Sequence, residues 1–554
     1  MIIKKSILFC MFAVFAAGLI FTTSPVKSDE TPYTIMVYMN GSDLESDFGL
    51  ATDDLAEMLD SGLRSENANV IILTGGTNRW VNGAIPETEC VIWQLKDGHL
   101  YEVESLGLAN MGNPKTLSDF IIFSMQNYPA QKYGLIMWDH GGGSIAGFGQ
   151  DEKFYDSALT LMDMKKAFED AGLRDNKLEF LGFDACLMAT VEMAILSADY
   201  AKILIASEDV EPGDGWDYHF LSILNRNPNI SGAALGKVIT DMFIRFYGRN
   251  SNEILTLSVT DLTKVQPVMQ AMGDLMAVAE VETEFIPLAT RRANTKTFGE
   301  GSPRDNYADM VDIGDMAVKL RDMYPRESAA VLRALKHCVV YNRHNSNVTL
   351  YGLSTFYIYG GKSIGAYSLD VYAGLGMDEI YTEYLHEFFA NLKEEHASPI
   401  VSHELALWQP IDENVFRLVG LSEEETDKWA VINGNFVPLY EFNATVDSHF
   451  FAIPAEINGV DVDIAFAKKN NTWELLGSRN SLEYVLQKGY DPILPGSEIA
   501  IYYEEWDFAT DTQTWAKGEY FTAQDELQLE WAFPPSDFIV MEICTDACGY
   551  QSIN

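Results

Sequence analysis

The chain has few basic residues for its length, and this shortage limits the partners that it can bind. Of its 554 residues only 38 are Lys or Arg, whereas 81 are Asp or Glu, so the formal net charge is −43. A protein of this charge repels phosphate groups, which makes nucleic acid and anionic membranes poor partners. The same charge attracts cations and suits a substrate that carries Lys or Arg. For most of the acidic residues, solubility outside the cell is the simpler explanation.

Cysteine is scarce as well, and one of the six cysteines lies in an apolar run near the N-terminus. Residues 1–28 place two lysines before this run and a polar stretch after it, which is the pattern of a secretory signal peptide. An uncleaved membrane anchor is the alternative, because the run is nearly long enough to span a bilayer. Removing residues 1–28 takes away three lysines and no acids, so the formal charge moves from −43 to about −46. We expect a protein that is secreted or located at the cell surface.

The five remaining cysteines are an odd number, which leaves at least one thiol outside any disulfide. Cys544 and Cys548 are close in the sequence and are the expected disulfide pair. Two metal ligands can have this spacing as well, but no second Cys or His pair follows them. A metal site is therefore the weaker alternative.

Several catalytic signatures are missing from the sequence. No His-Glu-x-x-His motif occurs, and the glycines at 141–143 lack both the Lys-Ser/Thr ending of a P-loop and the spacing of a dinucleotide fingerprint, so phosphate binding is a weak alternative. Ser144 lies in a near match to the serine-hydrolase pattern that ends in Ala. A group of acids does not match an EF-hand loop, and we interpret it as the solvated face of a helix, with calcium as the minor alternative. These acids are Asp43, Glu45, Asp47, Asp53 and Asp54.

The sequence does contain a regular alternation of strands and helices through about residue 395, which predicts an α/β fold. After residue 399, short alternating runs separated by Asn, Gly, Asp and Pro predict an all-β accessory domain. The expected organisation is a signal peptide at 1–28, an α/β domain at 29–395 and a β-rich domain at 396–554.

The expected elements follow from the period of the apolar residues. The strands of the α/β domain are 33–39, 70–73, 91–95 at a sheet edge, 133–140, 178–183, 203–206, 254–259 and 350–359. The helices are 43–63, 117–128 with Thr116 or Ser118 as its cap, 162–171, 187–198, 265–281, 311–323, 329–341 and 377–394. The strands of the β-rich domain include 429–432, 450–453, 460–467, 473–476, 499–503 and 527–531.

Two of these strands end in residues that can carry out chemistry. The first runs from Tyr133 to His140 and is followed by three glycines, and the second runs from Leu178 to Cys186. In open α/β sheets the functional residues gather beyond the carboxyl ends of the strands. A His and a Cys that meet there make a nucleophile and its proton-transfer partner.

A single Cys or His at a strand end is most often a buried structural residue, so each needs support from its surroundings. The helix expected at 187–198 would begin directly after Cys186, and the positive end of its dipole would favour the thiolate. Asp184 lies two residues before Cys186 and therefore points to the same side of the strand. The three glycines after His140 let backbone amides approach a substrate closely.

These motifs together resemble the clostripain family of cysteine peptidases, relatives of the caspases, legumains, separases and gingipains. The resemblance joins apolar strand-Asp-His-Gly-Gly-Gly to apolar strand-Asp-Ala-Cys and covers about residues 33–395. It includes the segments 38–45, 211–218 and 309–313. The β-rich domain lies outside it.

The resemblance implies a caspase-like α/β/α sandwich with a mostly parallel sheet, and a role for each matching residue. Cys186 matches the nucleophile, and His140 matches the group that protonates the leaving amine. This dyad needs no third member, so Asp139, which faces away by strand alternation, need not orient His140. The backbone amides of Gly141 and Cys186 would form the oxyanion hole.

The resemblance also implies cleavage after Arg or Lys, which requires a carboxylate in the first specificity pocket. Asp184 matches that position, and Asp214 is a second candidate, although a turn residue chosen for its backbone is an equal interpretation. Family members are often zymogens that cut themselves between the His and the Cys. Lys153, in a polar segment that we expect to be flexible, is the candidate site, rather than Lys165 and Lys166 on a helix.

The sequence thus predicts an exported cysteine endopeptidase with no cofactor. A calcium requirement remains a minor alternative, because clostripain uses calcium but has a longer excised linker. The expected partners are proteins or peptides with Arg or Lys before the cleaved bond, and the β-rich domain could bind a surface or glycan ligand. Two alternatives stay open: a catalytically inactive surface binding module of the same fold, and a hydrolase that uses Ser144.

Overall fold

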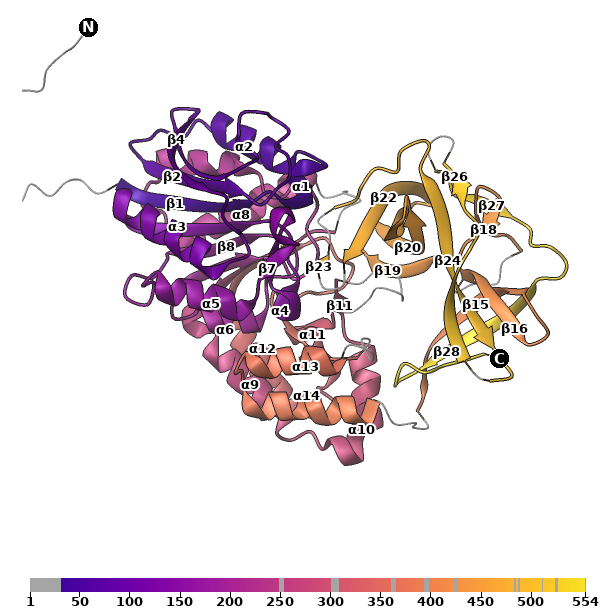
Figure 1. The fold of residues 1–554 in the computed structure, drawn as a ribbon. Helices are drawn as coiled ribbons and strands as arrows, with labels where there is room; N and C mark the ends of the chain where they lie inside the picture. The colour runs from indigo at the N-terminus through magenta and orange to yellow at the C-terminus, as the bar shows by residue number, and fades with distance from the viewer. Residues whose placement is uncertain are drawn as a thin grey trace, which may run out of the picture. The chain divides into compact units, whose positions relative to one another are not determined.

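The computed structural model places most of the chain after residue 30 (Figure 1). The predicted signal peptide, residues 1–28, lies outside the described residues. The described residues are 31–248, 254–299, 308–359, 365–392, 398–422, 427–482, 485–486, 489–510, 512–523 and 527–553.

A nine-stranded sheet forms the centre of the α/β part. Its strands are β1 (Thr31–Asn40), β2 (Ala68–Gly75), β3 (Cys90–Lys96), β4 (His99–Gly107), β5 (Ala130–Trp138), β8 (Phe180–Asp184), β9 (Ile203–Ala206), β10 (Thr256–Asp261) and β13 (Val339–His344). They lie in the order β13-β10-β9-β8-β5-β1-β2-β3-β4. The five strands from β9 to β2 are parallel, and the two added at each edge are antiparallel. The expected α/β fold with a parallel centre is confirmed.

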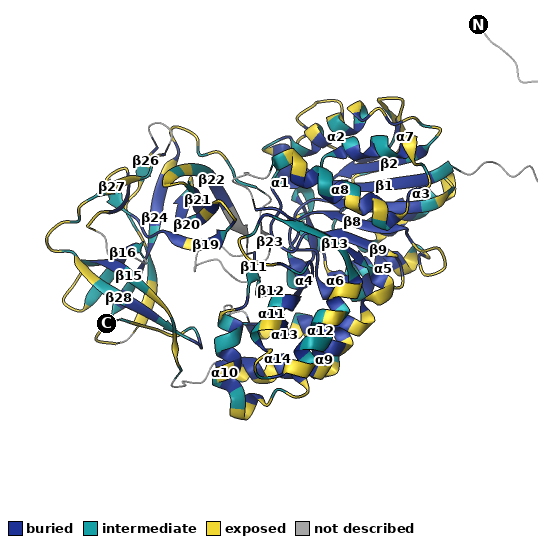
Figure 2. Ribbon diagram, turned by 180° about the vertical axis from the view of Figure 1, so that it is seen from behind, coloured by how far each residue is buried: buried dark blue, intermediate teal, exposed yellow. Residues whose placement is uncertain are grey.

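Some helices of the α/β part cover the two faces of this sheet, and others pack on those helices. They are α1 (Ser42–Ser46), α2 (Leu50–Asp60), α3 (Pro114–Asn127), α4 (Gly143–Ala146), α5 (Leu161–Asp170), α6 (Val191–Ser197), α7 (Ile223–Arg226), α8 (Gly232–Tyr247), α9 (Gln266–Met276), α10 (Val281–Ala293), α11 (Ile313–Lys319), α12 (Pro325–Cys338), α13 (Gly365–Gly374) and α14 (Glu379–Leu392). Successive residues of β1 alternate between two apolar cores, with Met36 in one and Val37 in the other. Leu55 of α2 packs in the core of Val37, and Phe120 of α3 packs in the core of Met36. The strands between the helices are accordingly buried along most of their length (Figure 2).

Several boundaries differ from the sequence prediction. The helix expected at 43–63 is broken at Gly49, whose φ of 74° no helix tolerates. Helix α3 begins three residues early, because Pro114 follows an Asn113 cap. Strand β3 is not at the sheet edge, since β4 pairs beside it. Helices α8, α10 and α13 and strand β4 were not predicted.

Two smaller sheets complete the α/β part. Strands β11 (Thr297–Phe298), β12 (Met310–Asp312) and β14 (Ser354–Phe356) form one, so the strand expected at 350–359 is only three residues long. Strands β6 (Phe148–Asp151) and β7 (Ser157–Leu159) form the other, a hairpin joined through the 3-10 turn η1 (Glu152–Phe154). This hairpin follows the glycines after β5.

The chain from Ile400 onward is built from strands, as expected. They are β15 (Ile400–Pro410), β16 (Val415–Ser422), β17 (Trp429–Ile432), β18 (Asn435–Phe436), β19 (Tyr440–Ala444), β20 (Ser448–Ile457), β21 (Val460–Lys469), β22 (Thr472–Leu482), β23 (Val485–Leu486), β24 (Glu498–Asp507), β25 (Thr512–Lys517), β26 (Phe521–Thr522), β27 (Glu530–Ala532), β28 (Ile539–Asp546) and β29 (Gln551–Ile553). Among the residues that the structure describes, no helix is long and apolar enough to cross a membrane.

The expected disulfide between Cys544 and Cys548 is wrong, because both residues carry thiols. Their side chains have different surroundings. Cys544 Sγ lies 3.5 Å from Nδ1 of His403 on the neighbouring strand β15, whereas Cys548 is buried in a large apolar cluster. A cysteine on a strand and another in the turn after it need not face each other, however short the interval between them.

Candidate active site

The two predicted catalytic residues leave the same edge of the central sheet. Strands β5 and β8 are parallel neighbours, and Trp138 pairs with Asp184 at their carboxyl ends. The Asp139 amide donates to the Asp184 carbonyl at 3.4 Å, which continues the alignment for one more residue. His140 and Cys186 each follow within two residues of that pair. The topology therefore brings together the residues that the sequence analysis selected.

Gly141 lies directly against the backbone of Cys186. A Cβ placed on Gly141 would be 1.9 Å from the Cys186 carbonyl oxygen and 3.1 Å from the Cys186 nitrogen. Only glycine fits this position, because the atoms that it approaches belong to the main chain. The two predicted oxyanion-hole residues thus lie side by side.

The prediction that a helix begins directly after Cys186 is wrong. Helix α6 begins at Val191, and Thr190 caps it by accepting a hydrogen bond from the Met193 amide at 3.0 Å. Before the cap, Leu187 has a φ of 61°, and the amide of Ala189 donates to Ser207. A helix dipole therefore cannot act directly on Cys186.

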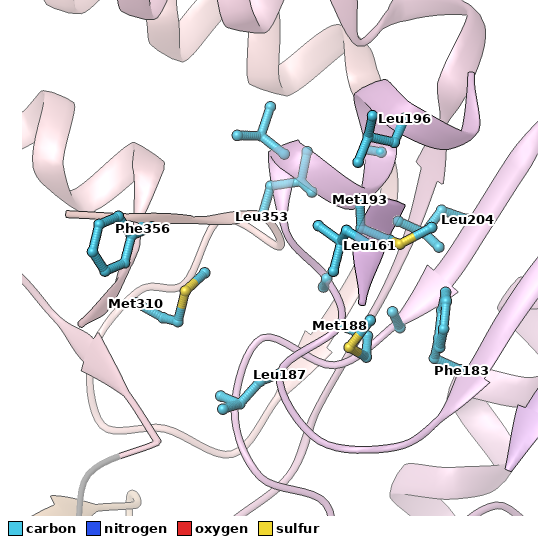
Figure 3. Close-up of a cluster of buried hydrophobic side chains, with 14 of the residues drawn as sticks. Leu161, Phe183, Leu187, Met188, Met193, Leu196, Leu204, Met310, Leu353 and Phe356 are labelled. Carbon is cyan, nitrogen blue, oxygen red and sulfur yellow. The ribbon is translucent and has the colours of Figure 1, made fainter. Parts of the chain in front are cut away.

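The turn after β9 supplies a polar group to the Cys186 sulfur instead. The Glu211 amide donates to Cys186 Sγ at 3.2 Å. The side chains that follow Cys186 are packed in the core: Figure 3 shows Leu187 and Met188 in a cluster of buried side chains that also includes Phe183 and Met310. Packing and one amide thus position the sulfur.

His140 is held by a carboxylate that the sequence analysis did not select. Its Nε2 lies 2.7 Å from Oδ1 of Asp43, and only 2% of the His140 side chain is exposed. Burial raises the pKa of Asp43, but the charge of His140 and the hydrogen bond between the two residues outweigh it, so the pKa is lowered overall. The ionised form of Asp43 is therefore favoured.

Asp139, the residue next to His140, serves the loop rather than the imidazole. Its carboxylate accepts hydrogen bonds from Asn40, from Ser42 at 2.7 Å and from the Gln150 amide at 2.7 Å. Complete burial raises the pKa of Asp139 to about 7.

The interpretation of the acidic group between residues 43 and 54 as a solvated helix face is wrong for three of its members. Asp43 contacts His140, Glu45 accepts from the Thr52 amide at 2.8 Å, and Asp54 accepts from the Trp138 indole. Glu45 and Asp54 are buried. The signal that could have found Asp43 and Glu45 is their place directly after β1, at the same sheet edge as His140.

A cluster of carboxylates surrounds the end of β8. Asp184 is fully buried and accepts from the Tyr218 hydroxyl at 3.0 Å and from the Trp216 amide at 3.2 Å. Burial raises the pKa of Tyr218, and the charges of nearby carboxylates raise it further. These carboxylates are Asp184, Asp54 and Glu211.

Asp214 belongs to the same cluster but is exposed. Burial raises the pKa of Tyr247, and the charge of Asp214 is the next largest cause, followed by Asp184 and Asp54. The charges of both predicted substrate-binding carboxylates thus act on Tyr247, together with the charges of Asp54 and Glu211. Glu211 lies in segment 211–218 of the family resemblance, but no local pattern assigned it a role, because the turn that carries it reaches β8 only through the fold.

The comparison with known proteins adds an independent observation. The sequence profile of the clostripain family matches residues 37–392, well over half of the chain. The chain belongs to the clostripain family of cysteine peptidases. The family match thus confirms the resemblance that the two strand-end motifs predicted.

Individual relatives are more distant from this peptidase. Clostripain from Hathewaya histolytica is 29% identical over 234 residues, which cover 36% of this chain and 43% of clostripain. The chain thus spans less than half the length of that relative. A secreted C11 cysteine protease from Bacteroides thetaiotaomicron, solved with an irreversible peptide inhibitor, is 16% identical, with a TM-score of 0.49. An inactive zymogen C11 protease from Parabacteroides distasonis is 20% identical, also with a TM-score of 0.49. Each alignment covers 62% of this chain and 98% of the other.

Lys153, the predicted self-cleavage residue, lies in η1 between β6 and β7 of the peptidase. The segment is more ordered than expected, because the carboxylate of Asp151 accepts from the Met111 amide at 2.7 Å and from the Lys153 amide at 2.9 Å. Tyr155 is nevertheless fully exposed, and it and Asp156 both have a φ of 58°. The hairpin therefore presents a projecting loop two residues after Lys153.

Ser144, the alternative nucleophile, is directed at a different partner. It is buried in α4, and its hydroxyl donates to Oε2 of Glu192 at 2.8 Å. Burial raises the pKa of Glu192, whose carboxylate also accepts from Thr355. The Glu192 carboxylate thus connects the segment after the glycines to β14, and the Ser144 hydroxyl makes a structural contact.

The two predicted catalytic residues are closed to solvent. Cys186 is 0% exposed and His140 is 1% exposed. The turn that contacts Cys186 is itself covered, since a Cβ on Gly489 would lie 2.8 Å from the Gly213 nitrogen. Only about 10 Å³ of open space remains where Gly489 meets this turn, roughly the room for one water. A substrate cannot reach the sulfur in this arrangement.

Proposed function

We propose that this peptidase is a secreted endopeptidase that cleaves peptide bonds after Arg or Lys and forms an acyl-enzyme on Cys186. The observation that carries this proposal is the group of carboxylates beside Cys186. Asp184 is buried there at the end of β8, and Asp214 is exposed on the neighbouring turn. A cationic side chain from a substrate would gain charge-assisted hydrogen bonds in such a pocket.

In the proposed reaction the Cys186 thiol gives its proton to His140, and the resulting thiolate attacks the carbonyl carbon of the residue before the cleaved bond. The amides of Gly141 and Cys186 receive the oxyanion, and each such donor can contribute about 3 kcal/mol. The C–N bond then breaks as His140 gives a proton to the leaving amine, which leaves a thioester. Water then attacks the thioester while His140 takes a proton from that water. The C–S bond breaks, the acid product is released and the Cys186 thiolate is regenerated.

Asp43 has a supporting role in this scheme. Its carboxylate lies 2.7 Å from His140 Nε2 and holds the ring in one orientation. An ionised carboxylate also stabilises the protonated imidazole that exists before the leaving amine is protonated. The proposed dyad of Cys186 and His140 thus works with an acid from the loop after β1.

The closed active site fits a latent form that is activated by self-cleavage. Lys153 lies in the connection between His140 and Cys186, next to the exposed loop at Tyr155. A cut after Lys153 would release the hairpin that follows the glycine loop while the sheet keeps the two pieces together. Export through residues 1–28 is part of the same proposal, and the Bacteroides thetaiotaomicron relative is described as secreted.

The test is to compare residues 29–554 with the Cys186→Ala variant on fluorogenic peptides that end in Arg, Lys or Asp. The chain is followed on a denaturing gel at the same time. We expect only the wild type to cleave after Arg or Lys and to split near Lys153. Turnover by Cys186→Ala would refute the nucleophile, and a preference for Asp would refute the pocket.

A further inference from the structure

A cavity outside the peptidase site lies in the β-rich region. It has a volume of about 590 Å³, within the range of ligand-binding pockets. Three aromatic rings contribute to its lining, from Phe451 of β20, Trp473 of β22 and Trp531 of β27. The peptidase reaction makes no use of this cavity.

The strand register explains how the rings come to share one surface. Lys468 pairs with both His449 of β20 and Trp473 of β22, and Phe451 lies two residues after His449 on the same face of its strand. Glu441 of β19 pairs with Phe451. The lining residues of β19, β20, β21 and β22 therefore form a row across one sheet face.

The three rings make a stepped platform. The ring centroids of Phe451 and Trp473 are 4.8 Å apart with planes at 52°, and those of Trp473 and Trp531 are 5.7 Å apart with planes at 45°. Trp531 is 43% exposed. Large aromatic rings that keep one face in water are suited to pack against a ligand with apolar patches and polar edges.

Polar groups surround the platform. The carboxylates of Glu441 and Asp447 and the side-chain amides of Asn470 and Asn471 are in exposed residues of the lining. These groups can accept from and donate to closely spaced hydroxyls. His449 adds a further polar group, 2.7 Å from Oε1 of Glu441.

We propose that this cavity binds a neutral oligosaccharide. A pyranose ring presents C–H groups on its faces and hydroxyls on its rim, which match aromatic rings flanked by carboxylates and amides. An acidic glycan is disfavoured, because the chain carries a formal charge of −43 and the three acids of the lining outnumber its one lysine, Lys468. These acids are Glu404, Glu441 and Asp447. The cavity lies on a sheet face, whereas an added peptide strand would need a sheet edge. The proposal does not depend on the peptidase activity.

The site would hold the peptidase at a glycan-covered surface. Because the ligand binds away from Cys186, occupancy should raise the local concentration of enzyme near its substrates without changing the chemical step. Loss of the cavity should therefore leave cleavage of small peptides intact.

Affinity electrophoresis can test the proposal with residues 29–554 carrying Cys186→Ala, which prevents self-cleavage. The probes are native gels that contain a soluble β-glucan, a mannan or a galactan, with polygalacturonate as the acidic comparison. We expect retardation in at least one neutral gel and none in polygalacturonate. Trp531→Ala should weaken binding by about tenfold, the loss of one well-placed aromatic contact.

The matched control is Phe533→Ala, which removes an aromatic residue that is 64% exposed, lies two positions away and does not line the cavity. Asp447→Asn provides a second, gentler variant that should also weaken retardation. Unchanged retardation of Trp531→Ala, or no retardation in any neutral gel, would overturn the proposal. Retardation in polygalacturonate alone, or capture of casein that Trp531→Ala abolishes, would overturn it in favour of another ligand.

Discussion

Substituting Gly141 with alanine tests the proposed oxyanion hole directly, because the fold leaves no room for a side chain there. A Cβ on Gly141 would lie 1.9 Å from the Cys186 carbonyl oxygen, and Cβ atoms essentially never approach another heavy atom within 3.0 Å. The two backbones must therefore separate by about 1.1 Å. Both atoms belong to rigid main chain, so a side-chain rotation cannot relieve the contact.

A shift of that size moves the Gly141 amide relative to the Cys186 sulfur. Misplacement of a catalytic group by about 1 Å can cost on the order of 100-fold in rate. Loss of one oxyanion donor costs a similar factor, about 3 kcal/mol. We therefore expect kcat on peptides ending in Arg or Lys to fall by about 100-fold. KM should change little, because the donors bind the transition state better than the substrate.

Initial rates over a range of peptide concentrations separate these two parameters, and melting temperatures show whether the variant is folded. Gly374→Ala is the matched control, because a Cβ at that position would meet nothing within 4 Å. A folded Gly141→Ala variant whose kcat stays within about threefold of the wild type would refute the reasoning.

Four further results are expected. Lys153→Ala should remain one chain on a denaturing gel, whereas Lys165→Ala should be cut as the wild type is; cutting of both would place the site elsewhere. Asp184→Asn should lower kcat/KM for peptides ending in Arg by about 100-fold, with a smaller loss for an uncharged residue, and an equal loss on both would point to a folding defect. Because the pKa of Asp43 is lowered on folding, its ionised form stabilises the fold above the unfolded pKa of about 3.8, and this contribution disappears as the pH falls through the folded pKa. The free energies of unfolding of the wild type and Asp43→Asn, from urea titrations, should thus differ at pH 5 and approach each other as the pH falls below about 3.8; a gap that widens with acid would contradict the pairing. Denatured protein prepared without reductant should react as five thiols, and a count of three would restore the disulfide.

The parallel strands and their two reactive ends could be predicted because both depend on local sequence. An apolar run bounded by turn residues indicates a buried strand, and adjacent parallel strands bring their carboxyl ends to one edge. That rule places His140 and Cys186 at one edge of the sheet, and the glycines after His140 and the family resemblance then selected them. The carboxylates from other elements could not be predicted in this way. The distance from Asp43 to His140 is set by the order of strands in the sheet, and the local sequence pattern does not contain that order.

The loop after Cys186 shows how tertiary contacts can override a local preference. Residues 187–190 are apolar or small and extend the helical pattern of α6 back to Cys186, so propensity alone predicts one helix. In the fold, Ala189 instead exchanges backbone hydrogen bonds with two other segments, donating to Ser207 and accepting from the Ser354 amide. Leu187 turns the chain with a φ of 61°. Because of these contacts, helix α6 begins only at Val191, with Thr190 as its N-cap. The contact of the Cys186 sulfur with the Glu211 amide thus depends on strands remote in sequence. Any variant that restores a helix at 187–190 should displace the sulfur from that amide.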